Sequence, residues 1–163
     1  MPHPLADAFR ATMRRWASGV TVVTAQDGTR RAGMTVSAFF SVTMEPPTVV
    51  VSLHEGAETL AHLRRSGAFA VSVLAEGMDA VSGRFAGYGL APGADRFEGV
   101  RTETHATGTP VLADAAAWMD CRVSALHVVG THVLVLGEVV ATAARDDARP
   151  LVYADRAYRR LQS

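Results

Sequence analysis

The sequence predicts a mainly β protein with α-helices, built as an antiparallel barrel that carries its helices on the outside. Two observations predict this class. Along the chain the order is β-rich, helix, strand, helix, β-rich, and tight hairpin signals join the strands where a parallel sheet would need crossover helices. A doubly wound parallel sheet is the less favoured alternative. The 163 residues match one typical domain of about 150, and no linker or repeat divides them, so we expect one domain over residues 1–163.

The first predicted element is an amphipathic helix over residues 4–16. Its large apolar residues recur at spacings of four, four and three, which places them on one helix face: Leu5, Phe9, Met13 and Trp16. Pro4 suits the first helical turn, and Gly19 follows the end of the pattern.

The next elements are strands. GVTVVTA leads into Asp27-Gly28, a strong hairpin signal, and the chain continues as strand-like sequence over residues 31–42. Pro46 and Pro47 interrupt the ladder because they lack backbone donors, and TVVVSL after them predicts a buried strand.

Two short helices and a β-rich end complete the prediction. A helix is expected over residues 59–65 with Leu60 and Leu63 facing inward, then a strand over residues 69–73. Another helix is expected around residues 78–85, and residues 88–110 show no strong periodicity. From residue 118 onward the alternation predicts two strands joined by a turn at Gly130-Thr131.

Missing residue types exclude several chemistries. All sixteen basic residues are arginine, so there is no lysine for a Schiff base, a phosphate-binding loop or a kinase-type ion pair. The single cysteine, Cys121, excludes an internal disulfide and a CxxC motif, and its alternation with Val123 predicts a small core residue.

Charge and hydropathy also narrow the function. Sixteen basic residues balance sixteen acidic ones without a clustered basic face, so we expect no binding to nucleic acid. No apolar run approaches the roughly 18 residues that span a bilayer, and residues 1–10 do not resemble a signal peptide. We therefore expect a cytoplasmic protein without a membrane partner.

Common site motifs are absent from the sequence. Gly87, Gly89 and Gly93 approach the dinucleotide fingerprint, but they follow a helical pattern instead of a strand. None of the six histidines pairs with another at the i, i+4 spacing, so no metal site is expected.

Hydroxyl side chains concentrate on the stretch GMTVSAFFSVTMEPPTVVVSL. In one extended strand, Thr35, Ser37, Ser41 and Thr43 would share a face. One interpretation is a solvated strand face; the other is a polar track for a flat, hydrogen-bonding ring. The loop 54–58 then enters the helix that starts near Thr59, where free N–H groups favour a phosphate. A ring track beside a phosphate site suits a flavin mononucleotide.

Four blocks, in order along nearly the whole chain, resemble one family. They are FRATMRRWASGVTVVTA; the GMTVSAFFSVTMEPPTVVVSL stretch; SGRFAG with DRFEGV; and CRVSALHVVGTHVLVLGEV with PLVYADRAYRRL. Together they resemble the flavin reductase domain of two-component monooxygenases, which has the FMN-binding split-barrel fold.

The resemblance implies a set of site residues. A backbone track would lie beside the flavin ring, Ser52 to Thr59 would meet the ribityl chain and phosphate, and the RFA block would complete the phosphate side. The candidate flavin-binding residues are Thr35, Val36, Ser37, Ala38, Ser41, Ser52, Leu53, His54, Thr59, Arg84, Phe85 and Ala86. His132 and Tyr158 would meet the nicotinamide. No residue is expected to act as a catalytic acid or base.

The resemblance also implies a reaction and partners. We expect hydride transfer from NADH or NADPH to FMN or FAD, supply of the reduced flavin to a partner monooxygenase, and a homodimer. The chain departs from the family pattern at Thr131, His54 and Ala157, where aspartate, asparagine and glycine are common. Thr131 puts the orientation of His132 in question. The alternative function is a flavin-binding module that stores or senses flavin without turnover.

Overall fold

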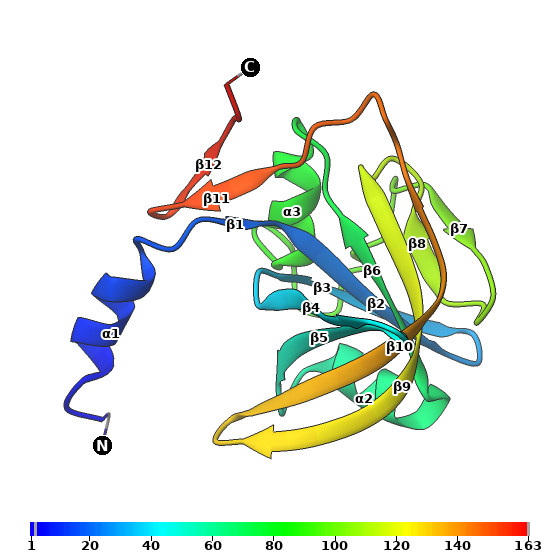
Figure 1. Cartoon of the computed structure of the whole chain (residues 1–163), viewed down its shortest axis with the longest axis horizontal. Helices are drawn as coiled ribbons and strands as arrows, with labels where there is room; N and C mark the ends of the chain where they lie inside the picture. Colours follow the sequence, from blue (N-terminus) through cyan, green and yellow to red (C-terminus); the bar gives the residue numbers. More distant parts are fainter. Residues whose placement is uncertain (2, 163) are drawn as a thin grey trace.

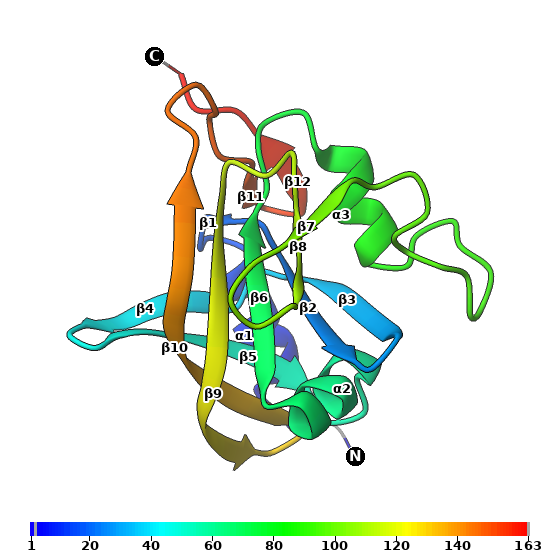
Figure 2. The same ribbon diagram turned by 90° about the vertical axis from the view of Figure 1, so that its right-hand side faces the viewer.

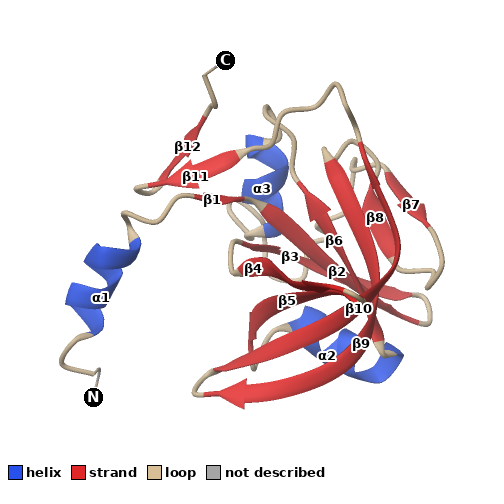
Figure 3. Cartoon of the chain, viewed as in Figure 1, coloured by secondary structure: helices blue, strands red, loops and turns tan. Residues whose placement is uncertain are grey.

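The computed structural model describes residue 1 and residues 3–162, and its ribbon is mostly strand with three helices (Figures 1 and 3). The helices are α1 (Ala6–Met13), α2 (Glu58–Ser66) and α3 (Asp79–Phe85). The strands are β1 (Ser18–Gly19), β2 (Thr21–Asp27), β3 (Arg30–Val36), β4 (Phe39–Met44), β5 (Pro47–His54), β6 (Ala68–Val73), β7 (Thr102–Thr104), β8 (Pro110–Leu112), β9 (Ala117–Val129), β10 (His132–Ala144), β11 (Val152–Ala154) and β12 (Ala157–Arg159).

One seven-stranded sheet forms the barrel, in the order β3-β2-β6-β9-β10-β5-β4, and every paired strand is antiparallel. β3 and β4 are consecutive in the chain, yet they form opposite edges of this sheet. Only residues 37 and 38 separate them, so the sheet must curl until its edges meet there. Figure 2 shows the two strands diverging from that junction. The prediction of an antiparallel barrel with outer helices is confirmed, and the barrel is split along the gap between β3 and β4.

The prediction that Thr35, Ser37, Ser41 and Thr43 share one face of a single strand is wrong. The chain leaves β3 after Val36 and enters β4 at Phe39, so Thr35 and Ser41 lie on opposite edge strands. A register shift between Ser41 and Thr43 breaks the alternation a second time. The physical reason is barrel closure, because the chain must turn a corner at residues 37–38 that a period-two pattern does not reveal.

Two buried clusters form the core. One fills the barrel and includes Leu60 and Leu63 of α2, as the sequence predicted; Gly67, at φ +70°, ends that helix. The other lies under α3 and includes Phe85 and Phe97. Helix α1 contributes no buried residue and stands apart from the barrel (Figure 1).

Two small sheets lie beside the barrel, and neither was predicted. β1, β11 and β12 form one, and β7 and β8 form the other. Their strands have two or three residues, too few to show a periodic pattern. No helix in the described part of the chain is long and apolar enough to cross a membrane.

Candidate functional site

A cavity of about 420 Å³ lies between the end of β3, helix α3 and the C-terminal hairpin β11–β12. It brings together Thr35, Ser37, Ala86 and Tyr158 from the predicted set, with Ser82 of α3. Thr35 Oγ1 donates to the Ser82 carbonyl at 2.6 Å. The Thr35 hydroxyl proton is thus used inside the protein, and β3 offers the cavity mainly the backbone groups of an edge strand. Of the predicted ring track, Thr35 and Ser37 line this cavity, whereas Val36 is buried and Ala38 does not line it.

A second cavity of about 340 Å³ opens at the start of α2 and is bordered by Gly33 and Met34 of β3. Thr59 lines it and is 3% exposed, and its hydroxyl has no hydrogen-bond partner among the described residues. Ala57 provides no side-chain cap for the helix, so the first N–H groups of α2 remain available. A hydroxyl that faces a cavity beside a helix N-terminus suits a phosphate group.

Gly33 lets β3 pass close to a pair of aromatic rings below this cavity. Phe85 and Phe97 meet edge to face, with 5.0 Å between ring centroids. A Cβ on Gly33 would lie 2.8 Å from Phe85 Cε1 and 3.2 Å from Phe97 Cζ. The position therefore requires glycine, which sequence reasoning did not single out.

The residues predicted on β4 and β5 are spread apart. Ser52 is half-buried and its N–H donates to the Ala38 carbonyl at 3.0 Å, which holds the strand junction. Leu53 is fully buried in the barrel core, so only its backbone is left to face a ligand. Ser41 is exposed on β4 and lines neither cavity.

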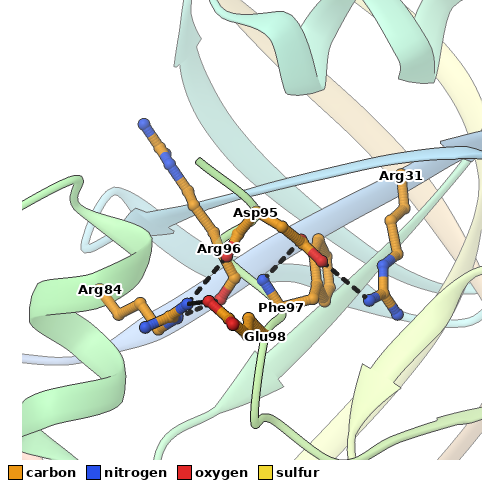
Figure 4. A network of polar contacts seen from close by, with 6 residues as sticks. All are labelled: Arg31, Arg84, Asp95, Arg96, Phe97 and Glu98. Carbon is orange, nitrogen blue, oxygen red and sulfur yellow. Dashed lines mark hydrogen bonds and ion pairs between the residues drawn. The ribbon is translucent and has the colours of Figure 1, made fainter. Parts of the chain in front are cut away.

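The predicted residues of the RFA block, Arg84, Phe85 and Ala86, do not lie at one site. Arg84 donates from Nε to the Arg96 carbonyl and from Nη2 to the Asp95 carbonyl, both at 2.9 Å, and pairs with Glu98 at 3.3 Å (Figure 4). Its guanidinium fastens loop 95–98 to α3 and does not line the cavity of Thr59. Arg96 lines that cavity instead, and its Nη1 donates to the carbonyls of Gly33 and Phe85. Arg96 is part of the DRFEGV block, but nothing in the sequence favoured it over Arg84.

The two predicted nicotinamide residues are separated within one chain. His132 begins β10 opposite His54 of β5, and their rings meet edge to face at 5.4 Å. Thr131 Oγ1 lies 3.0 Å from His132 Nδ1, and His54 Nδ1 accepts from the Gly56 N–H at 3.0 Å. The hydroxyl of Thr131, which stands where the family commonly has aspartate, thus contacts the His132 ring. No described cavity is lined by both His132 and Tyr158.

Other reactive groups do not form a site. Cys121 is fully buried; burial, and then the charge of Asp120, raise its pKa to about 12, so its thiol stays protonated. Within residues 1 and 3–162, no group of three or more His, Cys, Asp or Glu side chains is arranged to hold a metal ion.

Comparisons with known proteins agree on one class. Residues 13–162 match the family described as flavin reductase like domain. The FMN reductase (NADH) RutF of Variovorax paradoxus is 40% identical over 158 residues, which cover 97% of this chain and 86% of the relative. The reductase component of 4-hydroxyphenylacetate 3-monooxygenase from Thermus thermophilus is 40% identical over 160 residues, covering 96% and 97%. The structure of Streptomyces globisporus C-1027 NADH:FAD oxidoreductase SgcE6 with NAD and FAD fragments gives a TM-score of 0.88 at 29% identity, covering 99% and 96%.

Proposed function

We propose a function for this chain, which belongs to the flavin reductase like domain family. It reduces FMN or FAD with NADH or NADPH and supplies the reduced flavin to a partner monooxygenase. It is an enzyme, an NADH:flavin reductase with the split-barrel fold. Both FMN and FAD appear in the names of its relatives, and one relative is itself the reductase component of a monooxygenase.

The observation that carries the proposal is the pair of cavities that border successive stretches of β3 and its end. The backbone of residues 35–38 would face the flavin ring, and Thr59 with the first turn of α2 would hold the phosphate. The Thr59 hydroxyl, which makes none of the described hydrogen bonds and lines the cavity, fits this group. A bound flavin supplies the ring that accepts the hydride.

The chain's own contribution is positional and electrostatic. Holding a nicotinamide beside a bound flavin would replace a chance encounter of the two with a fixed geometry. Backbone N–H groups on the edge strand would stabilise negative charge more than a neutral ring, which favours the reduced product. No side-chain acid or base is required.

The site would be completed in a homodimer. Four apolar side chains of the α1 region are left uncovered: Leu5 at 64%, Phe9 at 64%, Met13 at 47% and Trp16 at 71% exposure. An apolar stripe of this kind normally faces another surface. We propose that a second copy of the chain covers this stripe.

A matrix of two flavins and two nicotinamides tests the activity. NADH or NADPH absorbance should fall only when protein and FMN or FAD are both present, and the relative rates identify the preferred pair. Flavin binding without loss of either nicotinamide would favour the alternative function, a storage or sensing module, and would overturn the reductase.

A further inference from the structure

A third cavity, of about 390 Å³, adjoins the cavity at the start of α2 and follows the loop of residues 87–96. The two cavities share Arg31, Glu58, Ala94 and Arg96 in their linings, so they are neighbouring parts of one groove. The first part is the one that we assign to a flavin phosphate. The part along the loop is not used by that assignment.

Two arginines, Arg31 and Arg96, line this groove, and Arg84 reaches segment 95–98 from outside it; the three differ in how many N–H donors remain free. Figure 4 shows Arg84 and Arg31 approaching segment 95–98 from opposite sides. Arg84 is occupied by two carbonyls and Glu98, and Arg96 Nη1 is shared between two carbonyls. Arg31 has one long contact, from Nη2 to Asp95 Oδ2 at 3.5 Å. Arg31 therefore keeps most of its donors for a ligand.

The Arg31 guanidinium is also held in place. Its Cζ lies 4.3 Å from the centroid of the Phe97 ring. Phe97 is 3% exposed and is fixed against Phe85, so the platform under the guanidinium is rigid. A flat, pre-oriented guanidinium can donate two parallel hydrogen bonds to a phosphate.

The rest of the lining suits a nucleoside. Glu58 offers a carboxylate, which repels a phosphate but accepts hydrogen bonds from ribose hydroxyls, and Leu90, Ala91 and Pro92 offer an apolar surface. We infer that this part of the groove binds the adenosine diphosphate half of a dinucleotide, with Arg31 as its phosphate ligand. The inference rests on the proposed function, which supplies two such dinucleotides, FAD and NADH.

Direct binding of ADP tests the inference without turnover. Calorimetry should detect ADP binding to the wild type, and Arg31→Gln should weaken it about tenfold or more, as expected for loss of charge-assisted hydrogen bonds. Arg31→Lys keeps the charge but not the planar fork, and should fall between the two. Arg30→Gln removes the same charge from the neighbouring β3 residue, outside both cavity linings, and should bind ADP like the wild type. No binding to the wild type, or unchanged binding to Arg31→Gln, would overturn the inference.

Steady-state kinetics distinguish the two sources of the ligand. If FAD supplies it, ADP competes with FAD, and Arg31→Gln raises the ratio of KM for FAD to KM for FMN about tenfold. If NADH supplies it, ADP competes with NADH while FMN is the flavin, and Arg31→Gln raises KM for NADH. Competition with neither overturns the dinucleotide assignment. If no flavin is reduced at all, the proposed function fails, and the calorimetry still reports whether Arg31 binds ADP.

Discussion

The phenol oxygen of Tyr158 donates a hydrogen bond to Ser82 Oγ at 2.7 Å, which joins the C-terminal hairpin to α3 across 76 residues of chain. The carbonyl of the same serine accepts from Thr35 Oγ1. Ser82, 1% exposed, therefore connects β3, α3 and β12 at the cavity proposed for the flavin ring.

Tyr158→Phe should lower the free energy of unfolding by about 1 kcal/mol, because it removes this hydrogen bond and keeps the ring. Urea unfolding measures the change. Tyr153→Phe, in the same hairpin at 5.4 Å from the Tyr158 ring, is the matched control and should stay close to the wild type. Equal losses for both variants would show that the bond to Ser82 is not the cause.

Gly33→Ala should destabilise the protein by about 1–3 kcal/mol, since the new Cβ overlaps Phe85 and forces the aromatic pair to shift. Gly19→Ala, with nothing within 4 Å of its Cβ, should change stability by less than about 0.5 kcal/mol. Thermal unfolding of the two variants compares them. A Gly33→Ala variant as stable as Gly19→Ala would contradict the packing described here.

His132→Ala should raise the apparent KM for NADH several-fold if this histidine meets the nicotinamide. His127→Ala, also exposed but on β9, is the control and should leave KM unchanged. Steady-state kinetics at saturating flavin measure both. An unchanged KM and turnover for His132→Ala would remove this residue from the nicotinamide contact.

Phe9→Glu should convert a dimer into a monomer, because it places a charge in the apolar stripe of α1. Ala11→Glu adds the same charge about 200° around the helix and should leave the dimer intact. Light scattering gives the mass of each variant. A wild type that is already monomeric would contradict the proposed assembly.

Acid should loosen the contact between the end of α1 and the C-terminal hairpin, where Arg14 pairs with Asp155. The hydrogen bond from Arg14 and its positive charge hold the pKa of Asp155 below its ordinary value of 3.8. A lowered folded pKa gives a contribution that is present above the ordinary value and is lost as pH falls through the lowered one. Trp16 fluorescence, in a Trp118→Phe background, should therefore change at a pH below 3.8. Asp155→Asn should abolish that transition; if it persists, another group causes it.

Much of the fold was accessible from local pattern. The Asp27-Gly28 turn and the inward Leu60 and Leu63 were predicted because each depends on neighbours in sequence. The break at residues 37–38 was not, because it comes from closure of the whole sheet. Strands of two or three residues likewise depend on tertiary partners that no window of sequence contains.

The site was predicted less completely than the fold. Residue type and order suggested Thr35, Ser37 and Thr59, which the structure places at cavities. Arg84 was chosen as the phosphate-side arginine and Arg96 was not, although both are arginines near glycine-rich sequence and residue type does not distinguish them. Only the three-dimensional arrangement shows that the Arg84 guanidinium donates to the carbonyls of Asp95 and Arg96.

Anaerobic mixing tests the central claim most directly. With oxygen excluded, NADH is added to purified protein and a small excess of FMN or FAD, and the absorbance of nicotinamide and flavin is followed together. Hydride transfer at this site predicts that flavin is bleached in equal amounts to the NADH consumed, and that omission of protein stops both changes. Flavin that binds but stays oxidised while NADH is unchanged, with both flavins and both nicotinamides, would contradict the account.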